Sequence, residues 1–87
     1  MRKIIFSPTA LADLQLFKSG NQKLVFKIFE LIKDIQNSPF QGIGKPEPLK
    51  ENYKGFWSRR INDEHRLVYK ISEEFIEIYS CHGHYQD

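Results

Sequence analysis

A chain of 87 residues with 40% apolar and 28% charged residues has an ordinary globular composition, which fits one soluble domain over residues 1–87 rather than a disordered chain. No apolar run exceeds three residues, so the sequence predicts neither a membrane span nor a secretory signal and favours a cytoplasmic protein. The net charge of +2 is too small to indicate nucleic-acid binding by itself, so any such site must be a local cluster of charge.

Cys81 is the only cysteine, which excludes an internal disulfide. No spacing of cysteine and histidine matches a zinc site. Within a strand this cysteine is most simply a small hydrophobe. The sequence therefore predicts no metal and no cofactor.

The first element is expected to be a short strand, Lys3–Phe6, followed by a helix from about Pro8 to Lys18. Ser7 has the side chain of an N-cap, and proline is favoured at the first helical position, where its missing N–H costs nothing. Gly20 ends this helix. Its apolar residues recur at helical spacing and predict one buried stripe, made of Ala10, Leu11, Leu14 and Phe17.

A second helix follows, with Asn21 as its candidate N-cap and the Asn-Ser-Pro sequence at 37–39 as its stop. Phe26 and Phe29 fall beside its main apolar face, which predicts that the helix covers a second surface, either in a homodimer or on a partner protein. One face of this helix is apolar and carries Leu24, Ile28, Leu31, Ile32 and Ile35. The other face is mostly charged and solvated and carries Lys23, Lys27, Glu30, Lys33 and Asp34.

Residues 38–48 contain three prolines and two glycines, so they are expected to form a loop of constrained shape. Four short segments follow, at 49–53, 56–61, 65–71 and 75–82, and turn residues separate them as in an antiparallel meander. The sequence therefore predicts an α+β fold. Two helices pack on one face of a four- or five-stranded antiparallel sheet, with the first strand added alongside.

Alternation along the two central strands assigns their side chains to faces. The face opposite the helices carries Arg60 and Arg66, which lie directly across from each other if residues 62–64 form a three-residue hairpin loop. Like charges so placed repel unless an anion lies between them, which indicates a phosphate site. The apolar face toward the helices takes Trp57, Ile61, Leu67, Tyr69 and Ile71.

An alternative interpretation is that both arginines face solvent or pair with Glu64 and Glu77. Arg59 and His65 fall on the apolar side of the pattern, so they are expected to mark its edge.

Glu47 lies between Pro46 and Pro48, which hold its backbone extended and leave it little freedom. Rigid placement suits a general base, and Lys45 and Lys50 flank the carboxylate. The alternative is an ordinary solvated loop residue.

His82 and His84 are the remaining candidates for acid and base chemistry, because imidazole titrates near neutrality. Their spacing also suggests a metal pair, but acid–base chemistry is favoured. Three nearby aromatic residues either stack on a nucleobase or belong to the core, namely Phe56, Tyr79 and Tyr85.

Four segments carry a resemblance to a known family. They are Gly44-Lys45-Pro46-Glu47-Pro48-Leu49-Lys50, Gly55-Phe56-Trp57-Ser58-Arg59-Arg60-Ile61, Glu64-His65-Arg66-Leu67-Val68-Tyr69 and His84-Tyr85. In order and spacing the chain resembles the YoeB toxins of the RelE family over nearly its whole length, including Ile32-Lys33-Asp34 and Ser38-Pro39-Phe40.

The resemblance implies a RelE-like fold and a toxin of a type II toxin–antitoxin system. Such toxins are endoribonucleases that bind the ribosome, usually as dimers, and cleave messenger RNA in the A site, which inhibits translation. A cognate antitoxin of the YefM or Phd type neutralises them by covering the active site. The implied partners are thus the antitoxin, the mRNA, the ribosome and a second copy of the chain.

By the same resemblance, Glu47 is the general base, Arg66 stabilises the transition state and His84 is the general acid. Lys50, Arg60 and Tyr85 match positions that bind substrate. The implied reaction is metal-independent attack of a 2′-OH on the adjacent phosphorus, which leaves a 2′,3′-cyclic phosphate. His82 is a rival acid, and Gln86-Asp87 extend the chain beyond the His-Tyr pair that commonly ends the family.

Two other functions stay open on the sequence. A gyrase-poisoning toxin of the same fold is expected to lack the combination of Glu47, Arg66 and His84. A non-catalytic ribosome-binding module predicts that substituting Glu47 leaves function unchanged.

Overall fold

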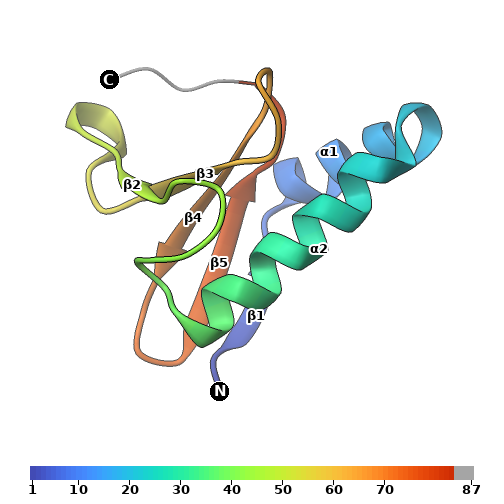
Figure 1. Cartoon of the computed structure of the whole chain (residues 1–87). Coiled ribbons are helices and arrows are strands. Elements are labelled where there is room, and N and C mark those ends of the chain that lie inside the picture. The colour runs from blue at the N-terminus through green and yellow to red at the C-terminus, as the bar shows by residue number, and fades with distance from the viewer. Residues whose placement is uncertain (84–87) are drawn as a thin grey trace.

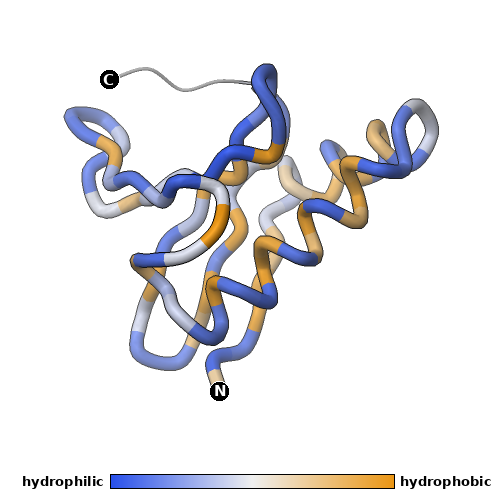
Figure 2. The backbone as a smooth tube through the Cα atoms, viewed as in Figure 1, coloured by the Kyte–Doolittle hydropathy of each residue, from blue (hydrophilic) through white to orange (hydrophobic). Residues whose placement is uncertain are grey.

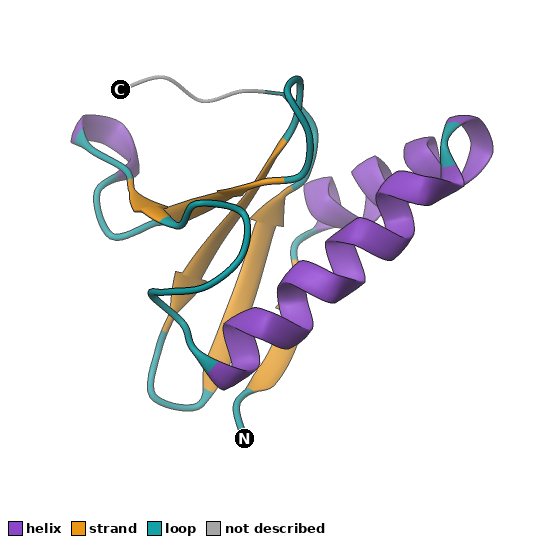
Figure 3. Cartoon of the chain, in the orientation of Figure 1, coloured by secondary structure: helices purple, strands orange, loops and turns teal. Residues whose placement is uncertain are grey.

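Two helices lie against one face of a five-stranded sheet in the computed structural model, which describes residues 1–83 (Figure 1). The strands stand in the order β1-β5-β4-β3-β2, and neither α1 nor α2 lies on the other face (Figure 3). This arrangement confirms the predicted α+β class. In chain order the elements are β1 (Lys3–Phe6), α1 (Pro8–Gly20), α2 (Gln22–Asn37), β2 (Glu47–Pro48), the 3-10 turn η1 (Glu51–Tyr53), β3 (Trp57–Arg60), β4 (Arg66–Ile71) and β5 (Phe75–Ser80).

The first helix begins as the sequence predicts. The Ser7 side chain accepts a hydrogen bond from the Ala10 N–H at 3.0 Å and so caps the first turn. Ala10 and Phe17 are buried and Leu14 packs against the core. Leu11 is 50% exposed, so the predicted stripe is wrong at this residue.

The second helix presents one apolar face to the sheet, and Figure 2 shows hydrophobic and hydrophilic segments alternating along it. Phe26 and Phe29 are exposed, at 72% and 51%. The prediction that the Asn21 side chain caps this helix is wrong: the side chain makes no capping hydrogen bond, and the Asn21 carbonyl oxygen accepts from the Leu24 N–H instead. Each buried aliphatic side chain contributes roughly 1.5–3 kcal/mol to stability, and those of α2 are Ile28, Leu31, Ile32 and Ile35.

The predicted faces of the central strands are confirmed. Five side chains lie in or against the core between the helices and the sheet, namely Trp57, Ile61, Leu67, Tyr69 and Ile71. No helix in the described part of the chain is long and apolar enough to cross a membrane.

The sheet is mixed, and the expectation of antiparallel pairing is wrong for one strand. Strands β2 to β5 are antiparallel to their neighbours, but β1 pairs with β5 in parallel, with Lys3 opposite Phe75 and Phe6 opposite Ile78. A parallel pair needs a long connection, and the helices and intervening strands provide it.

The predicted strand at 49–53 is also wrong. β2 consists of Glu47–Pro48 alone, and the chain then turns into η1. Glu51 has a φ of 52°, a left-handed conformation that an extended strand does not contain. At the other end of the sheet, β5 stops at Ser80, so the predicted strand to His82 is two residues too long.

Candidate active site

Glu47, Arg60 and Arg66 project from the sheet face that the helices leave open. Glu47 pairs with Ser58, and Arg60 pairs with Arg66. Paired residues of antiparallel strands share a face, as do residues two apart along one strand. The register therefore brings the predicted base and both arginines to one surface, with Ser58 between them, and confirms the predicted pairing of Arg60 with Arg66.

Arg66 is 8% exposed, and the hairpin backbone holds its guanidinium. Nη1 donates hydrogen bonds to the carbonyl oxygens of Asn62 at 2.7 Å and His65 at 3.1 Å. Burial lowers the pKa of Arg66, and the charge of Arg60 lowers it further, while the charges of Asp63 and then Glu47 act to raise it. Arg66 thus remains a cation in the field of the predicted base and the second arginine.

The hairpin itself is built by Asn62. Its Oδ1 accepts hydrogen bonds from the backbone N–H groups of Glu64 and His65, at 2.9 and 2.7 Å. The suggested pairing of the arginines with Glu64 and Glu77 is wrong for Glu64, whose carboxylate lies 3.9 Å from His65 Nε2. Glu77 stands opposite Lys70 in the β4–β5 ladder.

Glu47 lies in the exposed two-residue strand β2, and backbone hydrogen bonds fix the chain on both sides of it. Three residues before Glu47, the Gly44 carbonyl accepts from the Arg60 N–H at 2.6 Å. Two residues after it, the Leu49 N–H donates to the Phe56 carbonyl at 2.9 Å. Lys45 adopts a φ of 52°, so the chain turns sharply just before the Pro-Glu-Pro segment. The backbone at Glu47 is therefore held in place, as the flanking prolines predict.

Arg59 is the main residue that sequence reasoning placed wrongly. It is fully buried rather than at an edge, and its guanidinium forms an ion pair with Asp34 at 2.5 Å. It also donates to the Tyr69 hydroxyl oxygen and to three carbonyl oxygens of the loop, those of Ser38, Gln41 and Ile43. Asp34, expected to be solvated, is the counter-charge, and its hydrogen bond from Arg59 holds its pKa below the usual range.

This buried network fastens the Pro-rich loop onto the sheet. The Tyr69 hydroxyl donates to the Pro39 carbonyl at 2.8 Å, and Asp34 accepts from the Ile43 N–H at 3.0 Å. Gly42 crosses over Asp34 so closely that a side chain there would clash with the carboxylate. The signal in the sequence was a charged residue in the middle of an apolar strand face, two residues from Trp57.

Three aromatic rings cluster together, those of Tyr53, Phe56 and Tyr79. Phe56 lies 5.1 Å from Tyr79 and 6.5 Å from Tyr53, and Lys70 Nζ lies 5.4 Å from the Phe56 ring. All three rings are half-buried. Stacking of Phe56 and Tyr79 on a base, and substrate binding by Lys50, stay predictions.

His65 and His82 pack against Phe17 of α1. The His65 ring is 5.0 Å from Phe17 and 4.6 Å from His82, and His65 is only 7% exposed, so the expectation of an edge position is wrong. His82 stacks on Phe17 at 5.7 Å. The predicted acid His84 and the predicted binding residue Tyr85 lie outside the described residues.

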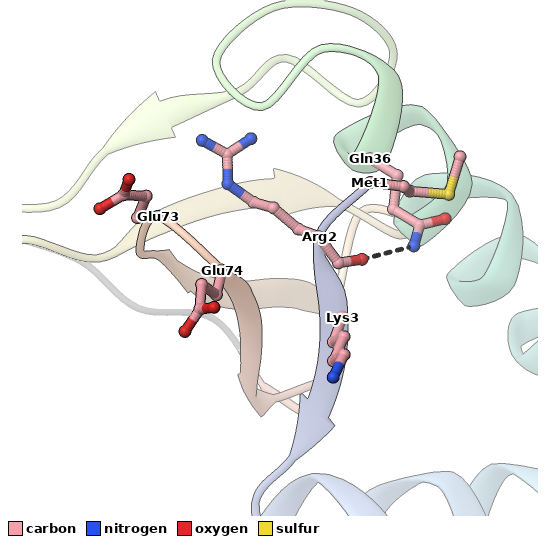
Figure 4. Close-up of a pocket in the computed structure, with 6 residues that line it drawn as sticks. All are labelled: Met1, Arg2, Lys3, Gln36, Glu73 and Glu74. Atoms are coloured by element: carbon pink, nitrogen blue, oxygen red, sulfur yellow. Dashed lines mark hydrogen bonds between the residues drawn. The ribbon is translucent and has the colours of Figure 1, made fainter.

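A pocket of about 440 Å³ lies past the Ile71 end of β4, away from Arg66. Figure 4 shows that its charged side chains are of both signs, with Glu73 and Glu74 beside Arg2 and Lys3. Its lining is Met1, Arg2, Lys3, Gln36, Glu73 and Glu74. Among residues 1–83, no three histidine, cysteine or acidic side chains gather as metal ligands.

Residues 6–85 match the family model described as the YoeB-like toxin of bacterial type II toxin–antitoxin systems. The chain belongs to this family. A curated relative, Toxin YoeB of Synechocystis, is 52% identical over 97% of this chain and 98% of its own length.

Two solved structures share the fold closely. The YoeB dimer from Staphylococcus aureus has a TM-score of 0.91 and 49% identity over 97% of this chain and 98% of that one. YoeB in the heterotetrameric YoeB–YefM complex from the same organism has a TM-score of 0.88 and 49% identity over 98% and 99%. The RelE-like architecture predicted from the sequence is thereby confirmed.

Proposed function

We propose that this toxin is an endoribonuclease that cleaves messenger RNA in the ribosomal A site and so inhibits translation. The observation that carries the proposal is the shared open face of Glu47, Arg60 and Arg66, a carboxylate and two guanidinium groups brought together by strand register. This set suits the cleavage of a phosphodiester next to a 2′-OH: a base is needed for the hydroxyl and cations for the phosphorane charge.

In the proposed reaction, the Glu47 carboxylate takes the proton of the 2′-OH as O2′ attacks the adjacent phosphorus. The bond from phosphorus to O5′ breaks, and His84 donates a proton to the departing O5′. The products are a 2′,3′-cyclic phosphate and a 5′-OH end. The scheme uses the protein's own acid and base and involves no metal or cofactor.

Arg66 would neutralise the charge that grows on the non-bridging oxygens, because its guanidinium is held at the open face by the hairpin carbonyls. Arg60, exposed and directly opposite, would bind the same phosphate. Lys50 and Tyr85 are assigned to substrate binding by the family resemblance. His84 is favoured over His82 because the His82 ring stacks on Phe17, toward the helix layer.

The antitoxin is proposed to be a YefM-like protein, since the Staphylococcus aureus relative forms a YoeB–YefM complex. An acidic or amphipathic segment of it would lie over Arg60 and Arg66 and block RNA. A homodimer is proposed as well, because another relative is a dimer. The exposed Phe26 and Phe29 of α2 are the candidate contacts for one of these partners.

The test compares Glu47→Gln with Glu51→Gln on mRNA in translating ribosomes. Both substitutions replace an exposed carboxylate by an amide of the same shape, and Glu51 lies in η1. Loss of a general base typically costs about 10²- to 10⁴-fold in rate, so Glu47→Gln should lose cleavage to that extent while Glu51→Gln cleaves like the parent. Analysis of the cut ends should find cyclic phosphate.

Parent-like cleavage by Glu47→Gln would reject the general-base role. Growth arrest without any mRNA cleavage would favour a binding module, and arrest relieved by a drug-resistant gyrase would favour a gyrase poison.

A further inference from the structure

His65 joins three parts of the molecule that the proposed reaction needs. Its backbone N–H donates to Asn62 in the hairpin, and its carbonyl accepts from the Arg66 guanidinium. Its ring lies against Phe17 of α1. Its Nδ1 accepts a hydrogen bond from the Gly83 N–H at 2.9 Å.

The last of these hydrogen bonds fixes the state of the ring. A nitrogen that accepts a backbone N–H carries no proton, so the neutral imidazole of His65 holds its proton on Nε2. A ring protonated on both nitrogens would present a donor to the Gly83 N–H and lose the contact. The ring therefore acts here as a hydrogen-bond acceptor for the backbone.

Gly83 is held from both sides. Its N–H donates to His65 Nδ1, and its carbonyl accepts from the Arg66 N–H at 2.9 Å. It has a φ of 88°, which glycine adopts without strain and which turns the chain at this point. The next residue in the sequence is His84, so the bonds to Gly83 set where the segment that carries the predicted acid begins.

We propose that the His65 side chain is a positioning group for the cleavage reaction, which orients the general acid through Gly83. This inference rests on the proposed function, because it gives His84 the part of proton donor. His65 itself touches neither substrate nor the reacting atoms. It acts by fixing the chain at Gly83, the residue that precedes the proposed acid in the sequence.

Two variants of His65 distinguish the effect of losing the hydrogen-bond acceptor from the effect of losing the aromatic ring. His65→Phe keeps an aromatic ring against Phe17 but removes the acceptor for Gly83. His65→Asn shortens the ring but places Oδ1 near the position of Nδ1, where it accepts the same N–H. Phe17→Leu is the matched packing control, since it alters the contact with the His65 ring and leaves the acceptor intact.

The decisive readout is a change of leaving group. Each variant is compared on ordinary mRNA and on mRNA with sulfur in place of O5′ at the cleaved linkage, because a thiolate leaves without a proton. His65→Phe should lose at least about tenfold on ordinary mRNA and less than about twofold on the sulfur substrate. His65→Asn should stay within about threefold of the parent on both, and Phe17→Leu should change both rates by the same factor.

A double variant gives a second readout. With His84→Gln already present, adding His65→Phe should lower the rate by less than about twofold, because the group that His65 positions is gone. The inference is overturned if His65→Phe cleaves ordinary mRNA like the parent, or if it loses the same factor on both substrates. If His84→Gln alone cleaves like the parent, the acid assignment of the proposed function is what fails.

Discussion

Arg60 and Arg66 stand directly opposite each other across the β3–β4 ladder, on the face of the sheet that α1 and α2 leave open. Two like charges in such a pair repel, and the lowered pKa of Arg66, due to burial and then to Arg60, reflects the same unfavourable surroundings. The free-energy cost of this repulsion falls when an anion binds between the two arginines. Anion binding should therefore stabilise the fold itself.

Arg60→Gln should accordingly raise the thermal stability of the free protein while it weakens phosphate binding. Relief of one like-charge pair at an exposed position is worth a few tenths of a kcal/mol, about the lower end of the range for cross-strand pairs. Unfolding temperatures are measured at low ionic strength, with and without inorganic phosphate. Phosphate should raise the melting temperature of the parent more than that of Arg60→Gln.

Lys33→Gln is the control for this experiment, since it removes the same charge from an exposed position on α2. It should leave the response to phosphate as large as in the parent. A lower melting temperature for Arg60→Gln in the absence of phosphate would contradict the proposed repulsion.

The ion pair of Asp34 with the buried Arg59 predicts a pH dependence of stability. The hydrogen bond from Arg59 lowers the folded-state pKa of Asp34 below its ordinary 3.8. The carboxylate therefore contributes stability that is present above pH 3.8 and is lost as the pH falls through the lower folded value. Asp34→Asn should be less stable at pH 7, by up to about 3–5 kcal/mol, because Arg59 stays buried without its counter-charge.

Urea unfolding at pH 7 and near pH 3 measures this difference. The gap between the parent and Asp34→Asn should narrow at the lower pH, where the parent begins to lose the pair. Asp63→Asn, in the exposed hairpin loop, should shift stability little at either pH. A gap of constant size would show that the contribution of Asp34 does not depend on its charge.

Gly44 and Gly55 both have a positive φ, of 78° and 99°, but only Gly44 is crowded. A Cβ at Gly44 would lie 2.9 Å from a methyl group of Leu31 and 3.1 Å from the Arg60 carbonyl, whereas one at Gly55 meets nothing within 4 Å. Gly55→Ala should thus cost roughly 1–2 kcal/mol of backbone strain. Gly44→Ala should add roughly 1–3 kcal/mol of overpacking and also reduce mRNA cleavage, because the loop before Glu47 must move.

Chemical denaturation and a cleavage assay on the same samples check the two glycine variants. Equal losses of stability in both, with unchanged cleavage, would mean that the packing of Gly44 against β3 does not position Glu47.

Cys81 should be unreactive in the folded protein. Burial raises the pKa of its thiol to about 12, with a further contribution from Asp13, and the thiolate is the form that reacts. A thiol reagent at pH 8 should therefore modify the native chain slowly and the urea-unfolded chain quickly. Rapid modification of the native chain would show that β5 opens readily at its end.

The sequence predicted those parts of the site that depend on local geometry. The pairing of Arg60 with Arg66 follows from a strand period of two and a three-residue loop, and the rigidity of Glu47 follows from two neighbouring prolines. The buried face of α2 follows from helical spacing. Each of these features is decided within a few residues of the chain.

The network around Arg59 was missed because its partners are distant in sequence. A buried guanidinium needs several acceptors, and these come from Asp34 on α2, Tyr69 on β4 and the carbonyl groups of the Pro-rich loop. Alternation along β3 alone places a charge on the apolar side without showing what satisfies it. The parallel pairing of β1 with β5 was missed for the same reason.

That parallel pairing bears on when the toxin acquires activity during its own synthesis. The first strand finds its partner in the last one, and the Ser7 side chain donates to the Tyr79 carbonyl, 72 residues away. A chain that grows from its N-terminus cannot complete the sheet until residue 80 has been made, and contacts of such long range form late in folding. While the chain is being translated, the ribosome that makes it is therefore exposed to an incomplete sheet, without an assembled site.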